Sequence, residues 1–204
     1  MMRYIYLLVV VGILSGGCMS PQHRPQSTAD RLRGATIMEK NQQWEDALRA
    51  YKDVQAQSDR SEQQREQARR GAARCLMHMG EYTAALAHLM PWPEDTAAPE
   101  ARRRLALGAE IALRMREWER AETLAEVALV DASPEGPEQL WEMFCCANLA
   151  RAYLENGKLS KAARMYAAAA SGLEKAGEQK TAHHCRSMVQ SIRRHLELTS
   201  DGDR

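Results

Sequence analysis

The fold is decided by residues 149–166, which read LARAYLENGKLSKAARMY. Ala150 and Ala162 stand twelve residues apart, and Leu159 lies three residues before the second alanine. Between them lies an Asn-Gly-Lys turn segment at 156–158, where glycine suits the left-handed conformation that ends a helix. Two helices in a tight antiparallel pair each need a small residue where their axes cross, and a bulky residue fills the wedge beside the turn. The stretch therefore predicts a helical hairpin.

The same pattern occurs four times in the chain. Each copy has a bulky apolar residue three positions before an alanine, and a second alanine twelve positions before the first. The bulky residues are Trp44, Tyr82, Trp118 and Leu159, and the paired alanines are Ala35/Ala47, Ala73/Ala85, Ala109/Ala121 and Ala150/Ala162. A single hairpin buries only part of its apolar surface, and stacking on its neighbours buries the rest. The repeats therefore predict a stack of hairpins.

The pattern resembles the tetratricopeptide repeat, whose signature has Leu-Gly-x-x-Tyr on the first helix and Ala-x-x-x-Phe on the second. The fourth unit matches with Leu149-Ala150-x-x-Tyr153 and Ala162-x-x-x-Tyr166, and the first unit keeps Ala47-x-x-x-Tyr51. In the second and third units, Leu89 and Ala125 take the aromatic place. The resemblance covers residues 29–176 and implies an all-α superhelical solenoid of about four hairpins.

The repeat spacing exceeds the usual 34 residues. The second alanine of each unit, from Ala47 to Ala162, recurs after 38, 36 and 41 residues. Polar or Pro-rich insertions at 58–62, 91–99 and 133–137 account for the extra length, so we expect repeats at 29–61, 62–93, 99–133 and 137–176. Longer spacing of this kind resembles periplasmic repeat lipoproteins that serve outer-membrane barrel assembly or pilus secretins.

After the repeats, residues 177–198 are predicted to form a capping helix. Its apolar residues fall at helical spacing and mark one face: Ala182, Cys185, Met188, Val189, Ile192 and Leu196. A solenoid needs a cap with a polar outer face, and this segment fits that role. Residues 199–204 are predicted to be a disordered tail.

The N-terminus has the layout of a secretory signal peptide over residues 1–17. A positive start is followed by an apolar run of roughly 11 residues, short of the ~20 that span a bilayer as a helix. The following Leu14-Ser-Gly-Gly-Cys18 resembles a bacterial lipobox, which implies that Cys18 is lipidated, with palmitate as a suitable label. Residues 18–28 would be a flexible tether, and Met19 after the cysteine implies the outer membrane. Ser15 stands where a large aliphatic residue is usual, so secretion without a lipid and an uncleaved anchor remain alternatives.

The composition and motifs argue against several functions. The 28 Lys and Arg nearly balance the 27 Asp and Glu, so no global charge favours nucleic acid. The sequence lacks a phosphate-binding glycine loop and the short motifs of common hydrolases and metal sites. His183, His184 and Cys185 have ligand chemistry, but consecutive helical residues point about 100° apart and cannot converge on one ion. We therefore expect no enzyme activity, cofactor or bound metal.

Four cysteines follow the proposed lipidation site: Cys75, Cys145, Cys146 and Cys185. We expect them to be small buried residues. A disulfide from Cys145 or Cys146 to Cys185 is the alternative, because the helices that carry them should be neighbours and exported proteins can hold disulfides.

The resemblance implies that the first helix of each hairpin lines a concave groove where protein partners bind. Helical spacing selects the following residues for it: Arg70, Arg74, Met77, His78, Arg103, Ala106, Glu110, Leu113, Arg114, Phe144, Ala147, Asn148, Arg151 and Glu155. This groove would be net positive, and arginine suits carboxylates, so an acidic or C-terminal peptide is the expected ligand. Asn148 stands where related repeats hold a ligand's backbone, whereas Leu32 and Thr36 break the carboxylate clamp of some relatives. A merely solvated basic face is the alternative.

The sequence as a whole favours a lipid-anchored, non-enzymatic scaffold in a bacterial envelope, facing the periplasm from the outer membrane. Such a protein would act as an adaptor in the assembly of a pilus, a secretion system or outer-membrane barrels. Two alternatives stay open: a structural or self-associating subunit of an envelope complex, and an activator of a periplasmic cell-wall enzyme.

Overall fold

The computed structural model describes residues 27–57, 60–96, 98–130 and 139–201. Over these residues the chain forms nine helices and no strand, which confirms the predicted all-α class. The helices are α1 (Thr28–Lys40), α2 (Trp44–Ala56), α3 (Glu62–His78), α4 (Tyr82–Leu89), α5 (Pro99–Arg114), α6 (Trp118–Ala128), α7 (Leu140–Glu155), α8 (Leu159–Lys175) and α9 (Gln179–Asp201). The predicted signal peptide, Cys18 and nearly all of the tether lie outside the described residues.

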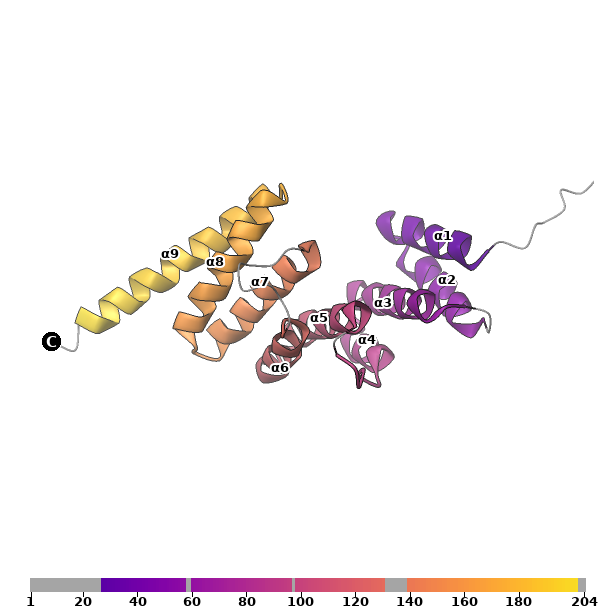
Figure 1. Cartoon of the computed structure of the whole chain (residues 1–204), viewed down its shortest axis with the longest axis horizontal. Helices are drawn as coiled ribbons and strands as arrows, with labels where there is room; N and C mark the ends of the chain where they lie inside the picture. The colour runs from indigo at the N-terminus through magenta and orange to yellow at the C-terminus, as the bar shows by residue number, and fades with distance from the viewer. Residues whose placement is uncertain (1–26, 58–59, 97, 131–138, 202–204) are drawn as a thin grey trace, which may run out of the picture.

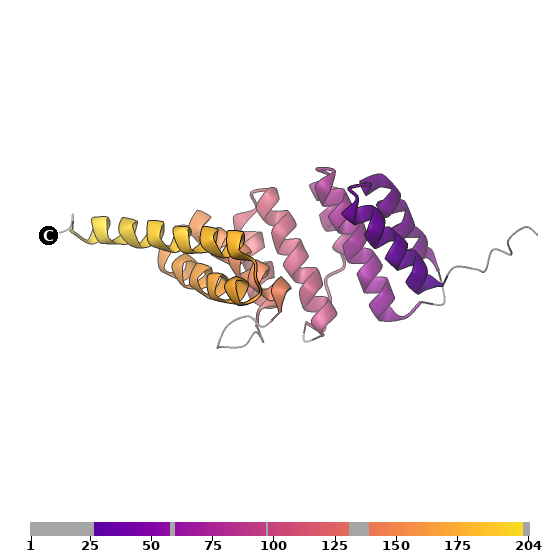
Figure 2. The same cartoon turned by 90° about the horizontal axis from the view of Figure 1, so that it is seen from above.

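The helices form antiparallel hairpins that follow one another along an elongated stack, with α1 at one end and α9 at the other (Figures 1 and 2). Each first helix packs on the first helix of the next hairpin, since α1 contacts α3, α3 contacts α5 and α5 contacts α7. Each second helix also packs on the first helix of the following unit. The arrangement is the predicted solenoid, and α9 packs on α8 at its end.

The paired alanines lie where the sequence pattern places them. All eight are at most 1% exposed, from Ala35 on α1 to Ala162 on α8. The bulky residues Trp44, Tyr82, Trp118 and Leu159 each begin the second helix of a hairpin. Small residues at the crossing points let the helix axes approach closely, so the alanine spacing and the bulky residue beside the turn together predict the hairpins.

Five tight turns join consecutive helices, and each contains one residue in the left-handed conformation. These residues are Gln42 (φ 61°), Gly80 (φ 83°), Arg116 (φ 61°), Gly157 (φ 74°) and Gly177 (φ 84°). In each turn the next N–H donates back to the third-last residue of the helix, as in Gln43 N to Met38 O at 2.9 Å and Glu178 N to Leu173 O at 2.8 Å. This is the Schellman end of a helix. The turn before α9 therefore repeats the turn within the hairpins.

Two of these turns use a side chain where glycine is better suited. A non-glycine residue in the left-handed region costs about 1 kcal/mol, so Gln42→Gly is expected to raise the free energy of unfolding by about that amount. The reciprocal change Gly157→Gln, at the same position of another turn, should lower it by a similar amount. Urea denaturation of both variants checks this pair, and equal signs for the two changes would contradict it.

The apolar core of the described residues is divided into clusters along the stack. The N-terminal cluster joins α1, α2 and α3 around Tyr51, and the middle cluster joins α3, α4 and α5 around Ile111. The C-terminal cluster runs from α5 to α9, and a small fourth cluster lies beside Trp118. Trp92, in the connection between α4 and α5, packs against both the middle and the C-terminal clusters.

The capping helix buries Ala182, Cys185, Val189 and Ile192 against α8, as its pattern predicts. It continues to Asp201, however, so the helix extends beyond residue 198 into the segment predicted as a disordered tail. The four cysteines at 75, 145, 146 and 185 are buried free thiols, which confirms the expected burial. Burial raises the pKa of Cys75 and of Cys146 to about 11 in each case.

Candidate functional site

The residues predicted to line the groove lie on α3, α5 and α7, and the structure separates them into several groups. Met77 is only 4% exposed and belongs to the middle cluster, so its assignment to the groove is wrong. Helix α3 contacts four other helices, which leaves little of its surface free, and the side on which Met77 lies is covered. Phe144 on α7 is 39% exposed and remains available to a partner.

Arg70 and Arg103 form an ion-pair group that ties α3 to α5. Both bind the carboxylate of Glu100, Arg70 through its Nη1 and Arg103 at 3.2 Å, and Arg103 also donates to Gln139 at 3.1 Å. The Arg70 side chain is only 12% exposed, and its burial lowers the pKa of the guanidinium even beside Glu100. These two arginines are therefore engaged within the chain rather than free for a ligand.

A first pocket, of about 640 Å³, lies where α1, α2 and α3 meet. It is lined by Thr36, Glu39, Lys40, Gln42, Trp44, Arg74 and His78. Arg74 donates to Glu39 twice, from Nε at 2.5 Å and from Nη2 at 2.9 Å, which is the bidentate geometry that favours a guanidinium–carboxylate pair. The indole of Trp44 stacks on the ring of His78, with centroids 4.3 Å apart.

Glu39 has a third donor in the hydroxyl of Tyr51, at 2.7 Å. Burial alone would favour the neutral acid, but the hydrogen bonds and charge of Arg74 and the Tyr51 hydroxyl outweigh it and lower the pKa of Glu39. Burial also raises the pKa of Tyr51 to about 12, so its hydroxyl remains a donor at neutral pH. The first pocket therefore already holds a fully bound carboxylate from the chain itself.

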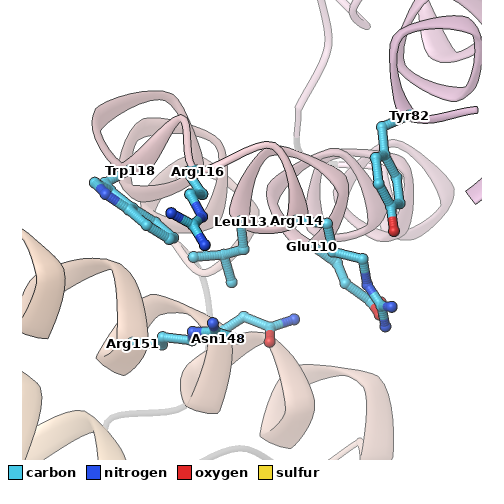
Figure 3. Close-up of a pocket in the computed structure, with 8 residues that line it drawn as sticks. All are labelled: Tyr82, Glu110, Leu113, Arg114, Arg116, Trp118, Asn148 and Arg151. Atoms are coloured by element: carbon cyan, nitrogen blue, oxygen red, sulfur yellow. The ribbon is translucent and has the colours of Figure 1, made fainter. Parts of the chain in front are cut away.

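A second pocket, of about 470 Å³, lies between the C-terminal end of α5, the start of α6 and the middle of α7. It is lined by Tyr82, Glu110, Leu113, Arg114, Arg116, Trp118, Asn148 and Arg151. Leu113 points from α5 toward Asn148 on α7, while Arg116 and Trp118 lie on one side and Arg114 and Glu110 on the other (Figure 3). Five of the predicted groove residues meet here: Glu110, Leu113, Arg114, Asn148 and Arg151.

The second pocket is positively charged. Its three arginines face a single acid, Glu110, which pairs with Arg114 at 3.0 Å. Arg116 and Arg151 are both exposed, and neither makes an ion pair with any residue in the described part of the chain. Two free guanidinium groups beside an amide can bind an anion, which is the chemistry that the sequence predicts for this groove.

Sequence reasoning missed three residues of this pocket: Tyr82, Arg116 and Trp118. All three belong to the turn and the start of the second helix, whereas the prediction considered only the first helices. The repeat pattern did carry a signal, because Trp118 is one of the bulky residues and Arg116 occupies the left-handed turn position just before it.

The remaining candidate cluster, at residues 183–185 of α9, does not bring its side chains together. His183 and His184 on α9 are exposed while Cys185 is buried, so the three side chains point in different directions. Among the residues that the structure describes, no three His, Cys, Asp or Glu side chains gather as metal ligands would. Within the same residues, no helix is both long and apolar enough to cross a bilayer.

The fold is similar to solved structures of tetratricopeptide-like repeat proteins. TPR-like repeats of a putative kinesin light chain from Podosopora anserina align with 82% of this chain and 95% of that chain, at 17% identity and a TM-score of 0.57. MamA from Desulfovibrio magneticus RS-1 aligns with 83% of this chain and 97% of its own, at 15% identity and a TM-score of 0.52. At such low identity these similarities establish the fold alone.

Two further comparisons give nothing. No family model matches the sequence. No curated protein sequence matches it either. Similarity to known proteins therefore establishes the repeat-solenoid fold of this chain and nothing more specific.

Proposed function

We propose that the protein is a non-enzymatic scaffold that binds partner proteins on the face formed by α1, α3, α5 and α7. The observation that carries this proposal is the second pocket, where Arg116 and Arg151 are exposed and form no ion pair with any described residue, beside the paired Glu110 and Arg114. Stacked helical repeats provide extended surfaces for protein partners. The exposed ring of Phe144, one helical turn before Asn148 on α7, adds an apolar anchor of the kind that interfaces favour.

Site-specific photocrosslinking tests this function. A photoreactive phenylalanine analogue at Phe144 should crosslink discrete proteins in the cells that make this protein. The same analogue at Trp44, the first residue of α2, samples the first pocket, and one at the exposed Asp53 of α2 serves as the control. Scaffolding on this face predicts crosslinks at Phe144 that are absent at Asp53, and identical patterns at the two positions would refute it.

We further propose that the scaffold is anchored to a bacterial envelope by lipid on Cys18, facing the periplasm from the outer membrane. The support is the sequence of the first eighteen residues, with its positive start, short apolar run and small residues before the cysteine. A lipid-bound stack of this kind suits an adaptor in the assembly of a pilus, a secretion system or outer-membrane barrels.

The anchor has a direct chemical test. Cells labelled with radioactive palmitate should incorporate the label into the wild-type protein, and Cys18→Ala should lose all of it, because the thiol is the only group there that can carry the thioether-linked lipid. Cys75→Ala, a buried cysteine, serves as the matched control and should keep the label. Equal labelling of Cys18→Ala and wild type would exclude lipidation at this residue.

A further inference from the structure

The two pockets occupy the same position in two different repeats. Lys40 and Arg114 end the first helices of their hairpins, Gln42 and Arg116 are the left-handed turn residues, and Trp44 and Trp118 begin the second helices. On the facing helix, each pocket has an arginine directly after a buried alanine: Arg74 follows Ala73, and Arg151 follows Ala150. The chain therefore contains two versions of one binding arrangement.

The first version shows what the facing arginine binds. Arg74 holds the Glu39 carboxylate through two hydrogen bonds at 2.5 and 2.9 Å, and the Tyr51 hydroxyl adds a third at 2.7 Å. The Glu39 side chain is only 14% exposed, so this carboxylate sits inside the pocket rather than at its rim. The chain thus fills its own first pocket with an internal acid.

The second version lacks that acid. The position that corresponds to Glu39 holds Leu113, and the position that corresponds to Tyr51 holds Ala125. Arginine stands at 151 as it does at 74, but apolar residues stand where the first repeat has the carboxylate and its hydroxyl donor. Arg151 is exposed and forms no ion pair with any residue that the structure describes. Arg151 therefore lacks the internal carboxylate partner that Arg74 has in Glu39.

We infer that the second pocket takes a carboxylate from an acidic segment of a partner protein, in the place where the first pocket holds Glu39. This inference rests on the proposed scaffold function and names the chemistry of its ligand. Arg151 supplies the bidentate contact, Arg116 and Arg114 add positive charge, and the Asn148 amide lies beside them for a second polar contact. The whole chain is nearly neutral, so the positive charge is confined to this pocket and does not form the long basic surface that a nucleic acid backbone needs. A short acidic peptide therefore fits the pocket better.

Leu113→Glu gives the sharpest test, because it should supply the second pocket with the internal acid that the first pocket has. The full-length protein in detergent would be titrated against fluorescein-labelled peptides by anisotropy. An acidic peptide has glutamates and an amidated end, a second peptide has glutamines and a free C-terminal carboxylate, and a third has glutamines and an amidated end. Binding to the first peptide, but not to the third, is expected, and binding to the second peptide alone would overturn the acidic segment in favour of a C-terminal carboxylate.

Leu113→Glu is expected to weaken that binding about tenfold, which corresponds to 1.4 kcal/mol. Because Leu113 is buried, the melting temperature and circular dichroism of the Leu113→Glu variant must match those of the wild type for the result to count. Arg151→Gln, at an exposed position, should weaken binding to a similar degree without any risk to the fold. Arg49→Gln removes an equal charge from the exposed side of α2 and should bind as the wild type does.

Several outcomes would overturn the inference. Equal binding of all three peptides would show that the carboxylate is not recognised. Inorganic phosphate that competes better than acetate at matched ionic strength would assign the pocket to phosphate instead. Loss of binding in Arg49→Gln as large as in Arg151→Gln would indicate general charge attraction.

The crosslinking experiment separates this inference from the scaffold proposal. If the Phe144 analogue crosslinks the same partners in wild type and in Arg151→Gln, the scaffold stands and the carboxylate site fails. If the wild type crosslinks no partner while the acidic peptide still binds, the site stands and the scaffold proposal fails. The two ideas can thus be rejected independently.

Discussion

Replacing Gly71 by alanine is expected to lower the free energy of unfolding by about 3 kcal/mol, the upper part of the range for overpacking a core. The ring of Tyr51 lies directly on this glycine, and an added Cβ would come within 2.3 Å of its Cζ and 2.5 Å of two neighbouring ring carbons. The ring is 1% exposed and its hydroxyl is bound to Glu39, so it has no room to retreat. Urea denaturation of the purified protein measures the loss.

Gly34 is the matched control, because it lies within α1 and an added Cβ would have no atom within 4 Å beyond its chain neighbours and the adjacent backbone of its own helix. Alanine costs less backbone entropy than glycine in a helix, so Gly34→Ala should raise the free energy of unfolding by about 0.5–1 kcal/mol. The two substitutions are chemically identical and opposite in expected sign. Destabilisation by both would show that the contact with Tyr51 is not what distinguishes Gly71.

Removing the charge of Glu39 is expected to cost about 1–3 kcal/mol of stability at neutral pH, the range for leaving a buried hydrogen-bonding group without its partner. Glu39→Gln would leave Arg74 and the Tyr51 hydroxyl without their shared carboxylate. The Arg74 side chain is 37% exposed, so water screens part of the pair and the lower half of this range applies. Asp46→Asn, which disturbs the exposed pair with Arg49, should change stability by less than about 0.5 kcal/mol.

The same carboxylate makes stability depend on pH. The folded protein lowers the pKa of Glu39 below its ordinary value of 4.5, so the folded state holds its proton less tightly than the unfolded state. The stabilisation is therefore fully present above the unfolded pKa and is lost as the pH falls through the folded pKa. Glu39→Gln should lose less stability than the wild type between neutral pH and pH values below 4.5. A parallel acid dependence for the two proteins would exclude this origin.

The sequence predicts the hairpins well because their determinants are local. The buried alanines, the bulky residue that begins each second helix and the left-handed turn residue all lie within one unit, so their spacing can be read directly. The candidate site is harder to predict from the sequence, because it depends on contacts between repeat units. Helical spacing places Met77 on the open face, but α3 packs against four other helices and Met77 lies in the middle cluster of the apolar core.

Local sequence patterns also do not reveal which charged residues pair with one another across repeats. Arg70 and Arg74 look alike in the sequence, yet Glu100 on α5 binds one and Glu39 on α1 binds the other. Arg151 has no such partner, because the third repeat, which it faces, carries Leu113 where the first repeat carries Glu39. That difference becomes meaningful only when the structure shows Glu39 and Arg74 in contact.

The divided core has a consequence for how this molecule loses its structure. Because each cluster is formed by neighbouring helices alone, we expect local opening of the first hairpin to cost less free energy than unfolding of the whole stack. Trp92 is the joint between the sections, since it packs against both the middle and the C-terminal clusters. Helices α5 and α7, which frame the second pocket, both contribute to the C-terminal section. The pocket therefore survives fraying of the end that would be tethered to the membrane.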